Sequence, residues 1–144
     1  MLLGEYTHTL DPKKRLSLPA KFRQEVGKKV VLTRGLDKCL FLYSTKQWEK
    51  IAEKLSDAST GQSDIRNFNR YMLAGAVEAD VDSLGRILVP DFLKDFAELG
   101  TKVVITGVHS RAEIWNEERW IEYKRKIVDQ ADVLAQKLGE IGVF

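Results

Sequence analysis

Cysteine, histidine and proline are scarce in this sequence of 144 residues, which contains one cysteine, two histidines and three prolines. The single cysteine, Cys39, cannot form an intramolecular disulfide, so the chain is not a disulfide-stabilised secreted domain. The cysteines and histidines are also too few for a zinc site of the usual composition. Because the sequence starts without a secretory signal, these absences favour a reducing cytoplasm.

Long apolar runs and catalytic motifs are also missing. No segment has the roughly 20 apolar residues that a membrane-spanning helix needs. The sequence has no glycine-rich phosphate loop, no His-Glu-x-x-His motif and no Gly-x-Ser-x-Gly motif. Asp80 and Asp82 are expected on one face of a strand, but the sequence places no lysine, histidine or metal ligand beside them to complete a mechanism. We therefore expect no catalysis, no metal and no cofactor, and a small hydrolase is the weakest interpretation.

The sequence does contain a repeated segment. Residues 10–19 return as residues 81–90, and each matched residue lies 71 positions later. In both copies an aspartate and an arginine four residues apart occupy a polar turn, which alternating segments flank and a proline follows. The pairs are Asp11 with Arg15 and Asp82 with Arg86. This duplication indicates two tandem repeats that share one core.

The remaining pattern predicts the same order of elements in both halves. The expected strands cover residues 5–10, 16–18, 30–33, 40–43, 77–81, 87–89, 103–106 and 113–116. The expected helices cover residues 21–26, 45–55, 63–75, 91–99 and 117–138, and the third is capped by Ser63 or Asp64. The apolar stripe of the last helix can pack on its own core or on a neighbouring subunit, and its own core is the favoured expectation.

The fold class is therefore α+β with a mainly β core. The predicted divisions are a first repeat at residues 5–56, a connector and helix at 57–76, a second repeat at 77–124 and a helical tail at 125–144. The connector begins in the small, polar residues 56–63.

Charge is distributed unequally between the two copies, although the formal net charge is only +2. Residues 11–29 contain seven basic and two acidic residues, whereas residues 77–100 contain two basic and six acidic residues. A polyanion would therefore bind the first copy more favourably than the second.

The turn itself has a structural and a functional interpretation. An aspartate that begins a turn accepts backbone N–H groups, and the arginine can pair with it. In the second copy, whose surroundings are acidic, this structural role explains most of the presence of the aspartate–arginine pair. In the first copy, Lys13 and Lys14 adjoin Arg15, and three neighbouring cations favour an anionic partner such as DNA. A turn of this kind can enter the major groove, where Arg15 can bind guanine O6 and N7 while the lysines bind phosphates.

Several segments closely resemble the MraZ family, and the similarity runs over almost the whole chain. They are Gly-Glu-Tyr at 4–6, Asp-Pro-Lys-Lys-Arg at 11–15 with Leu-Ser-Leu-Pro-Ala-Lys-Phe-Arg after it, Leu-Thr-Arg-Gly-Leu-Asp at 32–37 and Asp-Ser-Leu-Gly-Arg at 82–86. The resemblance implies a swapped-hairpin fold like that of the AbrB transition-state regulators. It implies that two tandem repeats form a double-split β-barrel with peripheral helices.

The same resemblance implies a function. It implies a sequence-specific transcriptional regulator that binds double-stranded DNA at direct repeats in the promoter of the bacterial division and cell-wall gene cluster, mostly as a repressor. It also implies a ring-shaped homo-oligomer in the cytoplasm, associated with the nucleoid and without a small-molecule substrate. The family's turn arginine is tied to DNA binding, which carries over to Arg15 and, by the repeat, to Arg86. Asp11, Asp82 and Gly85 are then structural partners in the turns.

One position departs from the family pattern. The family commonly has glycine immediately before the turn arginine, as at Gly85, whereas the first copy has Lys14. If that position needs a left-handed backbone, lysine costs about 1 kcal/mol there. Either the first turn has another shape, or phosphate contact by Lys14 offsets the cost.

An alternative function is open. The same barrel can serve an oligomeric protein-interaction module, antitoxin-like or a scaffold, whose tail helix is the docking surface. That function would depend on residues 120–138 and little on Arg15.

Overall fold

The computed structural model describes residues 1–58 and 61–144. Residues 59 and 60, inside the connector predicted at 56–63, lie outside the described residues. The strands are β1 (Leu2–Thr9), β2 (Arg15–Ser17), β3 (Lys29–Arg34), β4 (Leu40–Ser44), β5 (Val77–Asp80), β6 (Arg86–Leu88), β7 (Lys102–His109) and β8 (Ala112–Asn116). The helices are α1 (Ala20–Val26), α2 (Thr45–Asp57), α3 (Ser63–Leu73), α4 (Asp91–Phe96), α5 (Glu117–Asp129) and α6 (Ala131–Glu140). This composition confirms the α+β class.

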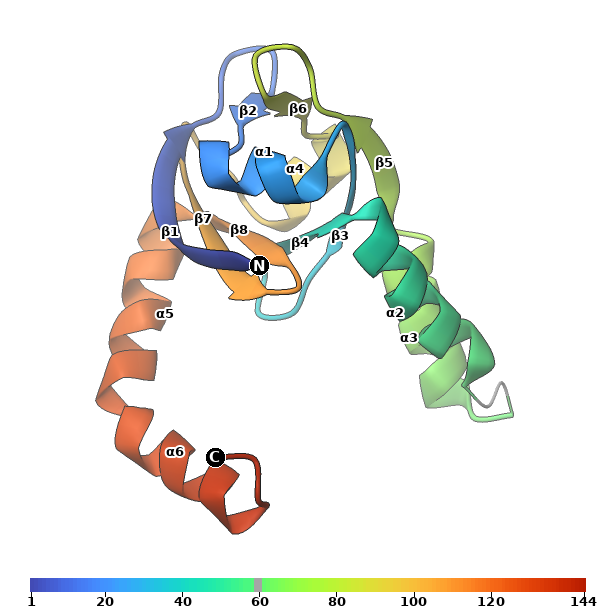
Figure 1. Cartoon of the computed structure of the whole chain (residues 1–144), viewed down its shortest axis with the longest axis vertical. Coiled ribbons are helices and arrows are strands. Elements are labelled where there is room, and N and C mark those ends of the chain that lie inside the picture. Colours follow the sequence, from blue (N-terminus) through green and yellow to red (C-terminus); the bar gives the residue numbers. More distant parts are fainter. Residues whose placement is uncertain (59–60) are drawn as a thin grey trace.

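The two repeats are interleaved in the sheets (Figure 1). Six strands pair in the order β1-β7-β8-β4-β3-β5, so the first strand of each repeat pairs with the third strand of the other. A separate two-stranded sheet joins β2 to β6. Within its own repeat, β2 pairs through an isolated bridge between Leu10 and Leu16. The strand that follows the first turn, β2, therefore pairs with the strand that follows the second turn, β6. Among the described residues, neither forms a ladder with the strand that precedes its own turn.

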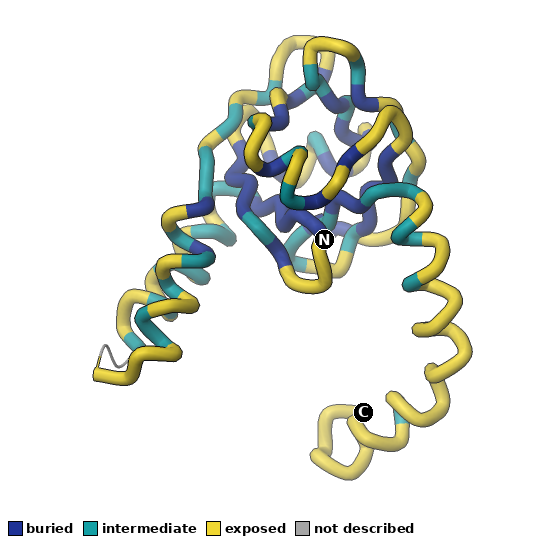
Figure 2. The backbone as a smooth tube through the Cα atoms, turned by 180° about the vertical axis from the view of Figure 1, so that it is seen from behind, coloured by how far each residue is buried: buried dark blue, intermediate teal, exposed yellow. Residues whose placement is uncertain are grey.

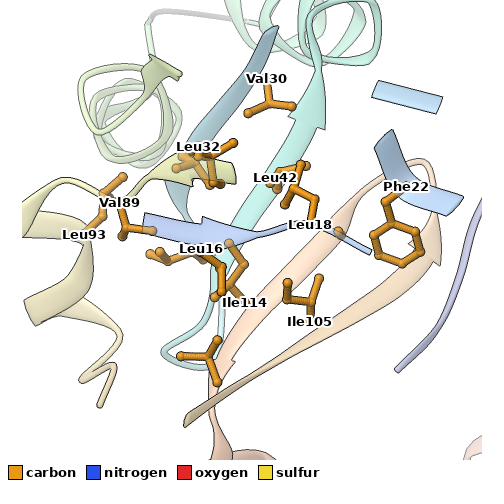
Figure 3. Close-up of a cluster of buried hydrophobic side chains, with 14 of the residues drawn as sticks. Leu16, Leu18, Phe22, Val30, Leu32, Leu42, Val89, Leu93, Ile105 and Ile114 are labelled. Atoms are coloured by element: carbon orange, nitrogen blue, oxygen red, sulfur yellow. The ribbon is translucent and has the colours of Figure 1, made fainter. Parts of the chain in front are cut away.

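The core lies between the large sheet, the small sheet and helices α1 and α4, and both repeats contribute to it (Figure 3). Leu16 and Leu18 of the first repeat and Ile87 and Val89 of the second are at most 1% exposed. Burial of four such side chains stabilises the fold by about 1.5–3 kcal/mol each. The prediction that the halves share a core is confirmed, whereas the exact repeat boundaries stay a prediction.

Side-chain caps begin two of the longer helices. Ser44 and Asn116 each accept a hydrogen bond from the backbone N–H three residues later, at 3.2 Å and 3.1 Å. Such a bond satisfies one of the free donors of the first helical turn. The predicted cap of α3 is wrong: Ser63 and Asp64 lie inside the helix, and Gln62 is the cap residue, without a side-chain bond.

Helix α4 is shorter than predicted, because it ends at Phe96 and not at residue 99. Glu98 adopts a left-handed backbone with φ of 53°. The N–H of Leu99 then donates to the carbonyl of Lys94 at 3.0 Å, which closes the helix end. The left-handed residue at this helix end is therefore a glutamate and not a glycine.

The tail is also different from the prediction. Instead of one helix there are two, and the chain breaks the helix at Gln130, although neither glycine nor proline marks the position. Trp120 and Tyr123 pack against a second apolar cluster, which contains Phe41, Tyr43 and Trp115. Leu134 and Leu138, in contrast, are more than 40% exposed. Helix α6 projects away from the sheets, as does the α2–α3 pair on the other side (Figures 1 and 2). The favoured expectation, packing of the tail stripe on its own core, holds for Trp120 and Tyr123 but is wrong for Leu134 and Leu138.

Candidate nucleic-acid interface

The first turn is built around one carboxylate. One oxygen of Asp11 accepts hydrogen bonds from the backbone N–H groups of Lys13 at 2.9 Å and Arg15 at 2.8 Å. The other oxygen accepts from Nε of Arg15 at 2.8 Å. The Lys14 N–H also donates to the Asp11 carbonyl at 2.9 Å. Asp11 therefore fixes the backbone of the turn and the direction of the arginine side chain.

The second turn repeats these contacts bond for bond. One oxygen of Asp82 accepts from the backbone N–H groups of Leu84 at 3.0 Å and Arg86 at 2.8 Å, and the other accepts from Nε of Arg86 at 2.8 Å. The Gly85 N–H donates to the Asp82 carbonyl at 2.9 Å. The two turns therefore have the same hydrogen-bond pattern around their aspartates.

The hydrogen bonds shift the acidity of both aspartates in the same direction. The main cause is the backbone N–H of Arg15, which lowers the pKa of Asp11 below its usual value, and the Arg15 guanidinium lowers it further. The backbone N–H and guanidinium of Arg86 lower the pKa of Asp82 in the same way. Both carboxylates are therefore ionised at neutral pH, as their role as acceptors requires.

The residue before each arginine has a left-handed backbone. Lys14 has φ of 62° and Gly85 has φ of 79°. The first turn therefore keeps the shape of the second, and of the two explanations offered for Lys14, a different turn shape is wrong. The strain of a lysine at this position, about 1 kcal/mol, is present in the folded chain.

Each left-handed position contacts a helix residue across the repeat boundary. The Lys14 ammonium forms an ion pair with Asp91, the first residue of α4. At Gly85, an added Cβ would overlap the guanidinium of Arg23 on α1, whose Nε donates to the carbonyl of Leu18 at 2.9 Å. Glycine is therefore favoured at position 85, because its backbone angle is left-handed and because any side chain there would have to displace the Arg23 guanidinium.

The β2–β6 ladder holds the two turns side by side at one end of the molecule (Figure 1). The opposed residues are Arg15 with Leu88, Leu16 with Ile87 and Ser17 with Arg86. Outside the ladder, the N–H of Val89 donates to the carbonyl of Lys14 at 2.8 Å, and the N–H of Leu18 donates to the carbonyl of Gly85 at 2.9 Å. Each turn is thus hydrogen-bonded to the segment that follows the other turn.

The ladder has one buried and one exposed face. Leu16 and Ile87 point into the core, where they are 0% and 1% exposed. Opposed residues of an antiparallel pair lie on the same face, and neighbours along a strand alternate. The other face, called here the ladder face, consists of Arg15, Ser17, Arg86 and Leu88.

The predicted DNA-binding residues surround this face. Among the described residues, the terminal guanidinium nitrogens of Arg15 and Arg86 have no hydrogen-bond partner, because only Nε is used by the turn. Lys13 is exposed and has no ion-pair partner within the part of the chain that the structure describes. Lys14 differs, since Asp91 already pairs with its charge. The Asp91 carboxylate therefore neutralises part of the positive charge that the sequence analysis assigned to a contact with DNA.

The geometry gives little support to catalysis at the predicted acidic pair. Asp82 is bonded within its own turn, and Asp80 lies 4.0 Å from Nζ of Lys29. Within residues 1–58 and 61–144, no cluster of three or more histidine, cysteine or acidic side chains has the geometry of a metal site. No described helix combines the length and apolar character needed to cross a membrane.

Sequence reasoning missed four residues of the site. Ser17 and Leu88 belong to the ladder face, and Asp91 and Arg23 contact the left-handed positions. Leu88 could have been found from the expected alternation of its strand, because its side chain must point to the face opposite that of Ile87. The signal for Asp91 was a second departure from the repeat, because its counterpart 71 residues earlier is alanine.

Comparison with known proteins agrees with this architecture. The model of the family described as "MraZ protein, putative antitoxin-like" matches the chain twice, over residues 1–71 and 72–138. The "Transcriptional regulator MraZ" of Caldanaerobacter subterraneus subsp. tengcongensis is 46% identical over 143 residues, which cover 99% of this chain and all of the relative. The proteins of the same name from Caldicellulosiruptor saccharolyticus and Moorella thermoacetica are 47% and 44% identical, with the same coverage.

The fold and the paired turns define an α+β protein made of two interleaved copies of one turn-bearing unit. The matches extend over both copies and nearly the full length. The chain belongs to the MraZ family.

Proposed function

We propose that this protein is a sequence-specific DNA-binding transcriptional regulator whose ladder face and two turns enter the major groove. The observation that carries the proposal is that two arginines, each held at Nε by an aspartate, lie on one exposed two-stranded ladder with their terminal nitrogens free for a ligand. A two-stranded β-ribbon fits the major groove, and a guanidinium with two free nitrogens can bind guanine O6 and N7.

The first turn contributes more of the binding in this proposal. Arg15 contacts a base, and the exposed Lys13 at the tip of the turn contacts a phosphate. Lys14 exchanges part of its pairing with Asp91 for a phosphate contact, which offsets the strain of its left-handed backbone. Arg86 contacts a second base, but the acidic surroundings of the second copy weaken its share.

The finer parts of the proposal follow the family resemblance. The chain forms a double-split β-barrel of the AbrB type and assembles into a ring-shaped homo-oligomer. The ring binds direct repeats in the promoter of the bacterial division and cell-wall gene cluster and mostly represses it, in the cytoplasm at the nucleoid. Several turns on spaced repeats would supply avidity that one small turn lacks.

Exposed apolar surface supports the assembly into a homo-oligomer. A groove of about 360 Å³ lies between β1 and α5, with Trp120, Ile121 and Val128 among its lining residues. The tail beyond it exposes the side chains of Val133, Leu134, Leu138, Ile141, Val143 and Phe144. Groups of exposed apolar side chains are typical of surfaces that contact another protein.

A salt-dependent titration tests the proposal. Wild type and Arg15→Ala are titrated against the duplex that lies upstream of the protein's own gene, with a shuffled duplex of the same composition alongside. We expect wild type to prefer the upstream duplex and its affinity to fall steeply with salt, because each neutralised phosphate releases counterions. Arg15→Ala should lose most of the preference while its mass in solution is unchanged. No preference in wild type would contradict the proposal.

The exposed tail favours one second function, a protein-interaction module that docks through α6. Truncation after Gln130 separates the two functions, because it removes α6 and leaves Trp120 and Tyr123 in their cluster. The regulator proposal expects the truncated chain to lose avidity but to keep its preference for the upstream duplex. The interaction-module function expects all activity to depend on the tail and none on Arg15.

A further inference from the structure

One residue of the ladder face is apolar. Leu88 is 58% exposed, whereas its neighbours in the strand, Ile87 and Val89, are at most 1% exposed. Its counterpart in the first repeat, 71 residues earlier, is Ser17. The two return strands therefore present the same backbone with a leucine on one and a serine on the other.

The register places this leucine beside the candidate base-contacting groups. Leu88 is the direct cross-strand partner of Arg15, so both side chains leave the ladder on the same face. Arg86 lies two residues before Leu88 on the same strand and also on that face. Leu88 is thus flanked by two arginines, each of which is fixed by its turn.

The surroundings of Leu88 decide what can cover it. A protein surface that buries Leu88 would also have to supply hydrogen-bond acceptors for the terminal nitrogens of the two flanking guanidinium groups, because burying them without acceptors is costly. The major groove of DNA offers both kinds of contact at once. It presents guanine O6 and N7 for arginine, and the thymine C5-methyl group as its apolar feature.

We propose that Leu88 packs on the C5-methyl group of a thymine next to the guanine bound by Arg15, and so sets the base preference at that position. The inference rests on the proposed function, since it assigns a role within the same DNA-contacting face. Ser17, opposite Arg86, has no such apolar contact to offer, so the two rungs of the ladder differ in the sequence that they prefer. Because its two halves prefer different bases, the pseudo-symmetric ladder should bind its DNA site in one of the two possible orientations.

Uracil tests the proposal, because it differs from thymine only in lacking the methyl group. Wild type and Leu88→Ala are titrated against the upstream duplex and against duplexes in which each thymine in turn is replaced by uracil. Val108→Ala is the control variant, since Val108 is 42% exposed on β7 at the end remote from the turns. Because both side chains are exposed, neither truncation removes core packing, and the mass of each variant in solution is measured in parallel.

We expect one thymine at which uracil weakens binding by wild type about fourfold, the change that corresponds to one buried methyl-sized group. Leu88→Ala should bind the thymine duplex about as weakly as wild type binds the uracil duplex. Replacement of that thymine by uracil should not weaken binding by Leu88→Ala any further. Val108→Ala should behave as wild type does.

Four results would overturn the inference. If wild type is indifferent to uracil at every position, or if Leu88→Ala keeps the full sensitivity, Leu88 does not contact a methyl group. If Leu88→Ala changes the mass of the protein in solution, the residue belongs to a contact between copies. If wild type does not prefer the upstream duplex over the shuffled one, the proposed function fails and the inference fails with it, which distinguishes this case from the other three.

Discussion

The two Asp-x-x-x-Arg turns have the same hydrogen bonds and opposite electrical surroundings. In each, one carboxylate oxygen accepts two backbone N–H groups and the other accepts Nε of the arginine. Yet residues 11–29 are rich in basic residues, and residues 77–100 are rich in acidic ones. The comparison separates two properties: the aspartate–arginine pair determines the shape of the turn, and the surrounding residues determine how strongly it attracts a polyanion.

Two of the departures from the repeat form a matched pair. The first copy has Lys14 where the second has Gly85, and the second copy has Asp91 where the first has Ala20. Lys14 and Asp91 form an ion pair, so each departure supplies the partner of the other. At Gly85 the space is instead occupied by the side chain of Arg23.

The largest expected difference between the turns is in DNA binding. Arg15→Ala should weaken binding to the upstream duplex by about 5- to 150-fold, the range for loss of a bidentate arginine–guanine contact, and Arg86→Ala should weaken it less. Titrations of both variants at one salt concentration check this, with Arg70→Ala on the exposed face of α3 as the control. Equal losses for the two turns would contradict the unequal shares assigned to them.

An exchange at the left-handed position should separate the turns next. Gly85→Lys should lower the free energy of unfolding by more than about 1 kcal/mol, because the new side chain meets both a left-handed backbone and the guanidinium of Arg23. Lys14→Gly removes the same strain and loses only an exposed ion pair of about 0–1 kcal/mol, so its stability should be unchanged or higher. Denaturant unfolding measures both, and a stable Gly85→Lys variant would show that position 85 does not need glycine.

Removing the partner of Lys14 should have a smaller effect, of opposite sign on binding. Asp91→Ala frees the Lys14 ammonium and removes a negative charge close to the first turn. DNA affinity should rise a few-fold, and the slope of log K against log salt should steepen by about one phosphate contact. The free energy of unfolding should change by less than about 1 kcal/mol. Unchanged affinity would mean that Lys14 stays away from phosphate.

The smallest expected effect is on acid stability. Because both turn aspartates have pKa values below their ordinary value of 3.8, their contribution to stability is complete above that pH and is lost as the pH falls through the lowered values. The double variant Asp11→Asn and Asp82→Asn should therefore lose less stability than wild type below about pH 4. Thermal unfolding between pH 3 and 6 measures the difference, with Asp132→Asn on α6 as the control, and parallel curves for all three proteins would contradict it.

Much of the fold could be predicted from local pattern. The turns, the helix caps at Ser44 and Asn116 and the shared core follow from spacing and alternation in the sequence. The pairing of β2 with β6 could not be derived in the same way, because a strand of three residues carries no signal for its partner. Only the family resemblance implied the exchange of strands.

The site was predictable where chemistry repeats and not where it depends on tertiary contact. Arg15 and Arg86 stand out because a charged pair is duplicated. Leu88 became part of the site only when the register of the ladder placed it opposite Arg15. The break of the tail at Gln130 had no signal at all, since apolar spacing continues through it.

Protection of guanine N7 from methylation by dimethyl sulfate tests most directly whether the two turns together contact bases in the major groove. With wild type bound to the upstream duplex, we predict protected guanines, one of which becomes reactive in the complex with Arg15→Ala and another in the complex with Arg86→Ala. The measurement is made at protein concentrations that saturate the duplex, so that weaker binding is not mistaken for a lost contact. A saturated complex in which every guanine N7 remains reactive would contradict the account, because binding would then involve the DNA backbone alone.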